Sequence, residues 1–426
     1  MNRGLFTRDF TLVVIGQIIS LFGNAVIRFA LPLYLLNQTG SSVLLGTVTA
    51  WALVPSIVFS PIGGIVADRV NKRTIMVVLD FFTAAVTLGF STCLEGESLV
   101  LLLTLTLMLL YGIAGAYQPS VQASIPALVK RDNLMTANAV INVVSSFSSL
   151  LGPALGGILY SVCGLRPLLW VCAACFTLSA IMEIFIKIPF QKQSSGGRIR
   201  DIVRADFMES IRFIRRERPV IGKVTQIACG INLFLSSLIL VGMPWLVTEV
   251  FVLSEKANQL YGFAQGALAM GGLLGGMAAG IFGGRMNIRK TGNLVIAAAL
   301  CLVPIGVSLF FGFPDLVSYG ILTFFCFLIM ILATVFTVRM ISFVQAETPK
   351  HLIGKVMSVI LTISMCAQPL GNVLYGVLFE RLRGREFVVI LLAAAASSVL
   401  AVSTKRVFQA LPNEGKEPDG MRQEKE

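Results

Sequence analysis

Twelve long apolar segments follow one another along this chain, and they restrict its fold more than any other feature. Each approaches or exceeds the length of about 18 residues that a helix needs to cross a bilayer. Of the 426 residues 56% are apolar and only 13% are charged, which is too apolar for a soluble domain of this size. The segments lack the alternation that a membrane barrel requires. The sequence therefore predicts an all-α integral membrane protein with 12 transmembrane helices.

The apolar segments form two sets of six. We expect the first six spans over residues 10–36, 42–67, 74–94, 98–124, 134–162 and 167–189. We expect the second six over residues 220–248, 257–284, 291–312, 315–346, 352–379 and 386–408. The predicted units are an N-terminal six-helix half (1–190), a cytoplasmic linker (191–219), a C-terminal six-helix half (220–410) and a disordered tail (411–426). The first span has no small-residue cleavage site and is read as a retained helix.

The distribution of positive charge predicts the orientation. Of the 34 Lys and Arg residues, 27 lie at the ends and loops of one side, 5 lie on the other side, and Arg28 and Arg339 lie within spans. Cytoplasmic loops carry the excess of Lys and Arg, so both termini and the linker are expected in the cytoplasm of a multi-pass cell-membrane protein. Since the positive charge follows the loops, it indicates contact with membrane lipids and no nucleic-acid partner.

The linker carries its own periodic pattern. Between Arg198 and Pro219 apolar residues recur every three to four positions, and arginines occupy the other faces. This pattern favours a basic amphipathic helix on the anionic inner leaflet. A solvated linker is the alternative.

Residues for catalysis or metal binding are sparse. The eight cysteines lie within or at the ends of apolar spans, Cys172 and Cys175 lack a second pair, and His351 is the single histidine. No phosphate-binding glycine loop, zinc-protease motif or Ser/His/Asp set is present in the sequence. We therefore expect no enzyme activity, no cofactor and no metal site.

The two halves repeat one another. Gly64-x-x-x-Asp68-Arg69-x-x-x-Arg73 is matched by a second copy from Gly280 to Arg289, at an offset of 216 residues. Gln122-Ala123-x-x-Pro126 is matched by Gln345-Ala346-x-x-Pro349, at an offset of 223. Gly164 is matched by Gly384, at an offset of 220. The sequence thus predicts two parallel six-helix repeats with a substrate site between them near the membrane midplane.

Two motifs carry a resemblance to a known family. The segment from Gly64 through Asp68, Arg69 and Lys72 to Arg73 resembles motif A of the major facilitator superfamily, with a one-residue shift in its basic part. The fifth span contains Gly152, Pro153, Gly156 and Gly157, which resemble motif C of the exporters in that superfamily. The segments 31–42 and 119–139 resemble the macrolide efflux and enterobactin exporter branch of its drug:proton antiporters.

The resemblance implies a role for each motif. Motif A would form a cytoplasmic latch in which Asp68 pairs with the other half when the cytoplasmic side is closed. A solvated loop that only sets the topology is the alternative. Motif C would bend and closely pack the fifth helix when the cavity faces inward, and ordinary helix packing is its alternative. Many proton-coupled relatives have an acid in the first helix and an arginine in the fourth. Here the first helix has Asn24 and the fourth has no arginine, so the coupling ion stays open.

Polar residues within the spans are costly in lipid and are candidates for substrate binding or ion coupling. At 100° per residue they form stripes on individual helices. The candidates are Gln17, Asn24 and Arg28 on the first helix, Tyr111 and Gln118 on the fourth, Gln226 and Ser237 on the seventh, and Gln368 and Asn372 on the eleventh. Arg28 has three alternatives, namely an anionic substrate group, an ion pair with an acid such as Glu249, or the outer surface. Asp80 and Glu183 are expected to have local structural roles near the helix ends.

Three functions are compatible with these patterns. The first is a monomeric secondary exporter of amphipathic small molecules, such as macrolide-like drugs or siderophore-like compounds, driven by an ion gradient. The second is an importer of a defined metabolite on the same fold. The third is a non-concentrative lipid-handling or sensor protein. The resemblance to motif C favours the exporter.

Overall fold

The computed structural model describes residues 7–94, 98–129, 133–188, 207–253, 256–282, 288–349 and 352–409. Across these ranges the regular secondary structure is helical, without a strand. Within these described ranges twelve helices are long and apolar enough to cross a membrane, which confirms the predicted number of spans. Their outer surface exposes large apolar side chains, for example Phe311 at 68% and Leu370 at 69%. Such a surface is suited to lipid and not to water.

The first six spans form the N-half, which comprises α1 to α6. Their bounds are α1 Arg8–Thr39, α2 Ser42–Arg69, α3 Lys72–Thr92, α4 Leu99–Leu128, α5 Leu134–Cys163 and α6 Leu165–Ile184. Side-chain caps fix two of the starts, because Thr7 Oγ1 accepts the Phe10 amide and Asn71 Oδ1 accepts the Arg73 amide.

The second six spans form the C-half. The seventh span consists of α8 Pro219–Ile231, η3 Asn232–Ser236, α9 Ser237–Trp245 and η4 Leu246–Val250. The eighth to twelfth spans consist of α10 Ala257–Phe282, α11 Gly292–Leu300 with α12 Leu302–Phe310, α13 Asp315–Glu347, α14 Ile353–Arg381 and α15 Glu386–Gln409. The π-helical turn η3 widens the seventh span near its middle, and the Ser237 hydroxyl donates back to the Asn232 carbonyl at 2.8 Å.

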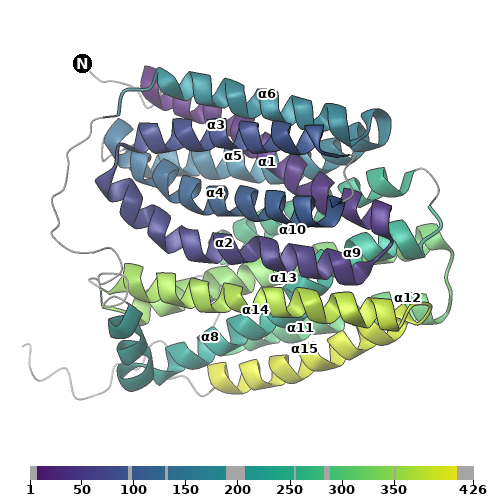
Figure 1. Ribbon diagram of the computed structural model, residues 1–426. Coiled ribbons are helices and arrows are strands. Elements are labelled where there is room, and N and C mark those ends of the chain that lie inside the picture. Colours follow the sequence, from purple (N-terminus) through teal and green to yellow (C-terminus); the bar gives the residue numbers. More distant parts are fainter. Residues whose placement is uncertain are drawn as a thin grey trace, which may run out of the picture.

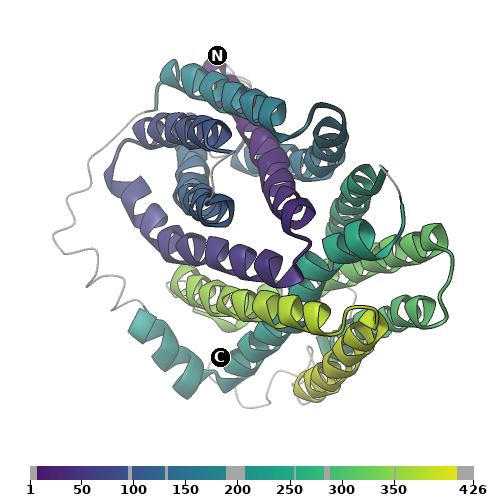
Figure 2. The same ribbon diagram turned by 45° about the vertical axis from the view of Figure 1, so that its right-hand side comes forward.

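Figures 1 and 2 show the N-half, in purple to blue, lying against the C-half, in green to yellow. The repeat predicted from the sequence is visible in the backbone. Gly164 has φ 77° before α6, and its counterpart Gly384 has φ 81° before α15. This left-handed conformation strongly favours glycine and sets the same reversal before the last span of each half.

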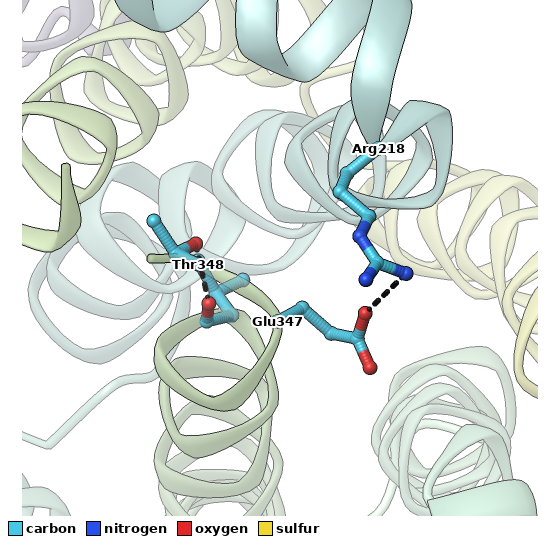
Figure 3. Close-up of polar contacts among 4 residues, drawn as sticks. Arg218, Glu347 and Thr348 are labelled. Carbon is cyan, nitrogen blue, oxygen red and sulfur yellow. Dashed lines mark hydrogen bonds and ion pairs between the residues drawn. The ribbon is translucent and has the colours of Figure 1, made fainter. Parts of the chain in front are cut away.

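The predicted linker helix falls only partly within the described residues. Residues 207–212 are helical and continue into the π-helical turn η2 Phe213–Glu217. Phe213 and Ile214 are buried among side chains of α8, α13, α14 and α15. Arg218 Nη1 lies 2.9 Å from Glu347 Oε2 of α13, and Figure 3 shows this ion pair. The described part of the linker is thus docked onto the C-half. Residues 189–206 and the tail 410–426 lie outside the described ranges.

An even number of spans places the start of α1 and the end of α15 at the same end of the bundle, at the left of Figure 1. We call this the terminal end and the opposite one the far end. The basic loop 381–385 lies at the far end. There Arg383 Cζ is 5.4 Å from the centre of the Trp245 ring, and Glu386 accepts the Gly384 amide. These contacts hold the loop in place.

Candidate functional site

The two halves meet at the far end through glycines. On α2 and α14, a Cβ added to Gly376 would lie 2.6 Å from the Ser42 carbonyl oxygen, and one added to Gly46 would overlap the Asn372 carbonyl. On α5 and α10, a Cβ added to Gly262 would lie 2.6 Å from the Pro153 carbonyl oxygen. Such distances are shorter than real Cβ contacts, so only glycine allows these backbones to approach this closely.

Polar contacts join the halves at the same end. The Glu380 carboxylate of α14 accepts the Ser42 backbone N–H at 3.0 Å and both the Ser41 and Ser42 hydroxyls at 3.2 Å. It therefore caps the start of α2 from the other half. Asn37 Nδ2 of α1 donates to Asn258 Oδ1 of α10 at 3.1 Å. We call these glycine and polar contacts the far-end seal.

Cavities lie between the halves on the terminal side of this seal. One, of about 370 Å³, lies among α5, the seventh span, α10, α13 and α14. It is lined by Ser149, Ile231, Leu235, Ser236, Ile239, Leu240, Gln265, Leu268, Ala269, Ile329, Met330, Ala333 and Gln368. A second, of about 480 Å³, lies between α5 and α10, towards the start of α5 and the end of α10. Ser149 and Ala269 line both cavities, so the two are adjacent.

Gln17, Asn24 and Arg28, which were predicted to share one face of α1, make different contacts in the structure. Arg28 Cζ lies 4.1 Å from the centre of the Tyr111 ring on α4, a cation–π geometry. Among the described residues Arg28 makes no ion pair, so the predicted alternative of an ion pair with Glu249 is not formed. The Arg28 Nε is buried without a hydrogen-bond partner. The Asn24 amide donates to the Ser20 carbonyl of its own helix. The structure thus brings Arg28 and Tyr111 together.

Gln17 has a different environment. It is fully buried inside the N-half, where its Nε2 donates to the Tyr117 hydroxyl of α4 at 2.6 Å. That hydroxyl donates to Glu183 Oε1 of α6 at 2.7 Å. Asp80 of α3 lies in the same group and accepts the Ser20 hydroxyl at 3.0 Å. The expectation that Asp80 and Glu183 lie at solvated helix ends is wrong, because packing of α3 and α6 against α1 buries both carboxyls.

Of the predicted candidates on the other helices, some line the cavity and others lie in contacts between helices. Gln368 lines the 370 Å³ cavity. Ser237 is buried and donates to the Gln368 carbonyl at 2.9 Å, so it ties α9 to α14. Asn372 is buried in the far-end contact, with its Nδ2 at 3.4 Å from Thr49 Oγ1. Gln118 is half-buried and Gln226 is exposed.

Sequence reasoning missed the apolar lining of the cavity and its polar members Ser149, Ser236 and Gln265. Apolar residues of a span that line a cavity have the same sequence pattern as those that face lipid. Gln265 lies on α10 and donates to the Tyr261 hydroxyl at 2.9 Å. In the sequence, the available signal was that Gln265 lies one helical turn after Tyr261, so that the two polar side chains share a face of the span. In the structure Tyr261 also stacks on Phe29 of α1 across the halves, with ring centres 4.9 Å apart.

The motif C residues lie in two helix contacts. A Cβ on Gly152 would overlap Ala25 of α1, and one on Gly156 would lie 3.3 Å from Phe29. Gly157 faces the C-half, where its added Cβ would lie 2.8 Å from the Asn258 carbonyl oxygen. Pro153 presents its carbonyl to Gly262. The face of α5 that carries Gly152 and Gly156 therefore packs on α1, and the adjacent face, with Pro153 and Gly157, packs on α10.

The motif A residues lie at the terminal end. Gly64, Asp68 and Arg69 belong to the last turns of α2, and their side chains lie outside the described part of the structure. Lys72 and Arg73 begin α3, and the Arg73 guanidinium donates to the Ile184 carbonyl at the end of α6. The second copy of the motif has Gly284 at the position that corresponds to Asp68. Residues 283–287 lie outside the described ranges.

In the described part of the chain, twelve helices long and apolar enough to cross a membrane form two halves that are sealed at one end and enclose cavities beyond the seal. This arrangement is that of a membrane transporter. Comparison with known families then identifies it. The model of the Major Facilitator Superfamily matches residues 13–372, and the chain belongs to that superfamily.

Relatives with assigned names include efflux proteins. The chain is 24% identical over 380 residues to macrolide efflux protein A of Streptococcus pyogenes, covering 86% of this chain and 88% of that protein. It is 23% identical over 368 residues to the multidrug efflux pump Tap of Mycolicibacterium fortuitum, covering 84% and 86%.

Solved structures share the fold at low identity. A mutant of the nucleoside transporter NupG aligns with a TM-score of 0.77 at 14% identity, covering 94% of this chain and 99% of that one. A bacterial homologue of the iron transporter ferroportin aligns with a TM-score of 0.71 at 16% identity, covering 94% and 98%.

Proposed function

We propose that this chain exports amphipathic small molecules from the cytoplasm by alternating access, driven by an ion gradient. The observation that carries the proposal is the lining of the 370 Å³ cavity. Nine of its thirteen lining residues are apolar, four are polar and uncharged, and none is charged. A cavity of this kind suits a molecule with a large apolar surface and a few hydrogen-bonding groups.

The relatives support the direction of transport. Macrolide efflux protein A and the pump Tap are both named for efflux, and both align over most of their length. The solved structures of similar fold include a nucleoside transporter and a D-xylose-proton symporter, so the fold by itself does not select export. Import of a defined metabolite is therefore the second candidate.

In this proposal the terminal end faces the cytoplasm of a cell-membrane protein, as the excess of Lys and Arg at that end favours. The structure then corresponds to an inward-facing state, with the far-end seal closed towards the outside. The close packing of the motif C glycines on α1 and α10 fits this state. The chain would act as a monomer, with membrane lipids around its apolar surface.

Opening to the outside requires the cytoplasmic ends of the halves to meet, and the motif A latch on Asp68 is proposed for that step. A charge-assisted pair that forms in one state alone shifts the balance of the two states. Replacement of Asp68 by Asn should leave the protein folded and slow transport, and transport at the normal rate would exclude the latch.

The test is transport in inside-out membrane vesicles, with erythromycin, ethidium and a catecholate siderophore as probes. We expect at least one probe to accumulate when an ion gradient is imposed and to leak out when the gradient is dissipated. Accumulation in right-side-out vesicles alone would support the importer. Uptake that is indifferent to every imposed gradient would contradict secondary transport.

A further inference from the structure

Two carboxyl groups lie together inside the N-half, away from the cavity. Asp80 of α3 is 2% exposed and Glu183 of α6 is fully buried. Gln17 and Ser20 of α1 are fully buried beside them, and Tyr117 of α4 is 4% exposed. Four helices therefore enclose one polar group in an otherwise apolar bundle, which we call the carboxyl cluster. Ionisable groups inside a membrane bundle are costly and are expected to serve a function.

The donors in the cluster do not satisfy its acceptors. Ser20 donates to Asp80 Oδ1 at 3.0 Å, and Tyr117 donates to Glu183 Oε1 at 2.7 Å. The second oxygen of each carboxyl, Asp80 Oδ2 and Glu183 Oε2, is buried with no hydrogen-bond partner, and so is Gln17 Oε1. Three buried acceptor oxygens thus lack a donor. A buried acceptor without a donor is strongly unfavourable.

No positive charge among the described residues compensates the two carboxyl groups either. Among the described residues neither Asp80 nor Glu183 forms an ion pair with Lys, Arg or His. The titratable groups that face the cluster are Asp80 itself from α3, Tyr117 from α4 and Glu183 from α6, while α1 contributes only Gln17 and Ser20. The nearest described cation along α3 is Arg73, seven residues before Asp80 and so about 10 Å away along the helix axis.

A bound proton reduces both deficits. It removes one of two adjacent negative charges, which low-polarity surroundings make very costly. The resulting O–H also supplies a donor for one of the unpartnered oxygens. A hard metal ion would need about six oxygen ligands. The cluster offers three free oxygens, and the described residues include no group of three or more His, Cys, Asp and Glu side chains that could hold a metal.

The cluster is placed to influence the far-end seal through α1. Two residues of the cluster, Gln17 and Ser20, belong to α1. Further along the same helix Phe29 stacks on Tyr261 of the C-half, and Asn37 donates to Asn258. The change from one to two negative charges would weaken the packing of α1 on α3 and α6. The far-end contacts would respond because α1 carries both.

We propose that Asp80 and Glu183 form a shared proton-binding site that couples transport to the proton gradient. This inference rests on the proposed export function. A proton taken up from the outside would reside on Asp80 Oδ2 or Glu183 Oε2, and it would leave to water on the cytoplasmic side as the cycle advances. The site replaces the acid that the first helix lacks.

The first experiment detects the proton without transport. Infrared difference spectroscopy of the purified protein, titrated from pH 9 to pH 5, should show the band of a protonated carboxylic acid. The band should be absent from the double variant Asp80→Asn with Glu183→Gln and unchanged in the control Asp315→Asn, which removes the acid at the start of α13. A wild-type band that persists in the double variant would overturn the site, as would a wild type without such a band.

The second experiment measures coupling in proteoliposomes that hold the full chain. Accumulation of erythromycin driven by a pH gradient should fall at least about tenfold in the double variant. Exchange of erythromycin between equal concentrations on the two sides should continue. Accumulation by the double variant at the wild-type level would overturn the proposal, and so would accumulation driven by a sodium gradient at uniform pH. If wild-type protein moves no probe at all, the export function fails, and the infrared titration still decides whether the proton site exists.

Discussion

Glu380 on α14 caps the first turn of α2 through the backbone N–H of Ser42, at 3.0 Å, although the two residues belong to different halves. An N-terminal cap is normally supplied by the chain just before the helix. In the proposed transport cycle, opening the far-end seal would separate Glu380 from Ser42 and leave the first turn of α2 uncapped. The contact would then favour the closed state of the seal.

Replacement of Glu380 by Gln should open the far-end seal more often. Loss of a charged cap is worth ~1 kcal/mol, which corresponds to about a fivefold shift in the ratio of the two states. The measurement is the rate at which an impermeant maleimide labels a cysteine placed at Thr49, which is buried in the seal. The control is Glu386→Gln, because Glu386 caps Gly384 within its own half. Equal labelling rates with and without Glu380 would contradict the role of this contact.

Replacement of Gly376 by Ala should prevent full closure of the seal. The added methyl would lie 2.6 Å from the Ser42 carbonyl oxygen, a backbone atom that cannot move by itself. Overpacking of this kind costs about 1–3 kcal/mol. We expect slower transport and faster labelling at position 49, while Gly320→Ala on α13, where a methyl meets nothing within 4 Å, leaves both unchanged. Normal transport by Gly376→Ala would show that tight closure is unnecessary.

Arg28 and Tyr111 should contribute to substrate binding through their mutual contact, so that the effects of replacing them are not additive. A cation–π contact is worth about 0.5–2 kcal/mol, so its loss should change the KM for erythromycin roughly two- to thirtyfold. Arg28→Gln and Tyr111→Leu should have similar effects, and the double variant should add little to either. Tyr111→Phe keeps the ring face and serves as the control. Additive effects of the two substitutions would mean that the residues act separately.

Filling the 370 Å³ cavity should change substrate selection. Ala333 of α13 lines this cavity, and Ala333→Trp should exclude large substrates while smaller ones still fit. Export of erythromycin should fall at least about tenfold, and export of ethidium should fall less. Ala395→Trp, on the exposed side of α15, is the control for bulk alone. An equal loss for both substrates would place the binding site elsewhere.

Sequence patterns predicted the membrane-spanning helices well, because a span must be long and apolar throughout. The ends agree within a few residues, as in α5, which was expected over 134–162 and is found at Leu134–Cys163. Gly164 and Gly384 matched in sequence, and both have a positive φ, 77° and 81°, directly before or near the start of the last span of each half.

The site could be predicted only in part. A helical periodicity gives the face on which Gln17 lies, but it does not give the helix that covers that face. Asn372 and Gln17 therefore lie inside contacts instead of on the cavity. Glu183 lies at the end of its span and Asp80 lies within the first half of its span, and only the packing of α3 and α6 on α1 brings them together. Tertiary packing determines both the burial of Gln17 and Asn372 and the proximity of Asp80 to Glu183.

The central claim is that the far-end seal must open in every transport cycle, and cross-linking tests it most directly. Asn37 and Asn258 contact each other across the halves at 3.1 Å. Both can be replaced by Cys in a variant without the eight native cysteines, and then joined by a short bifunctional methanethiosulfonate reagent, which forms a reducible disulfide with each Cys. Asn37 and Tyr160, which lie 3.2 Å apart within the N-half, provide the matched control pair. We predict that the cross-link between the halves stops transport and that reduction restores it, while the control pair transports normally. Transport that continues through the cross-linked seal would contradict the account.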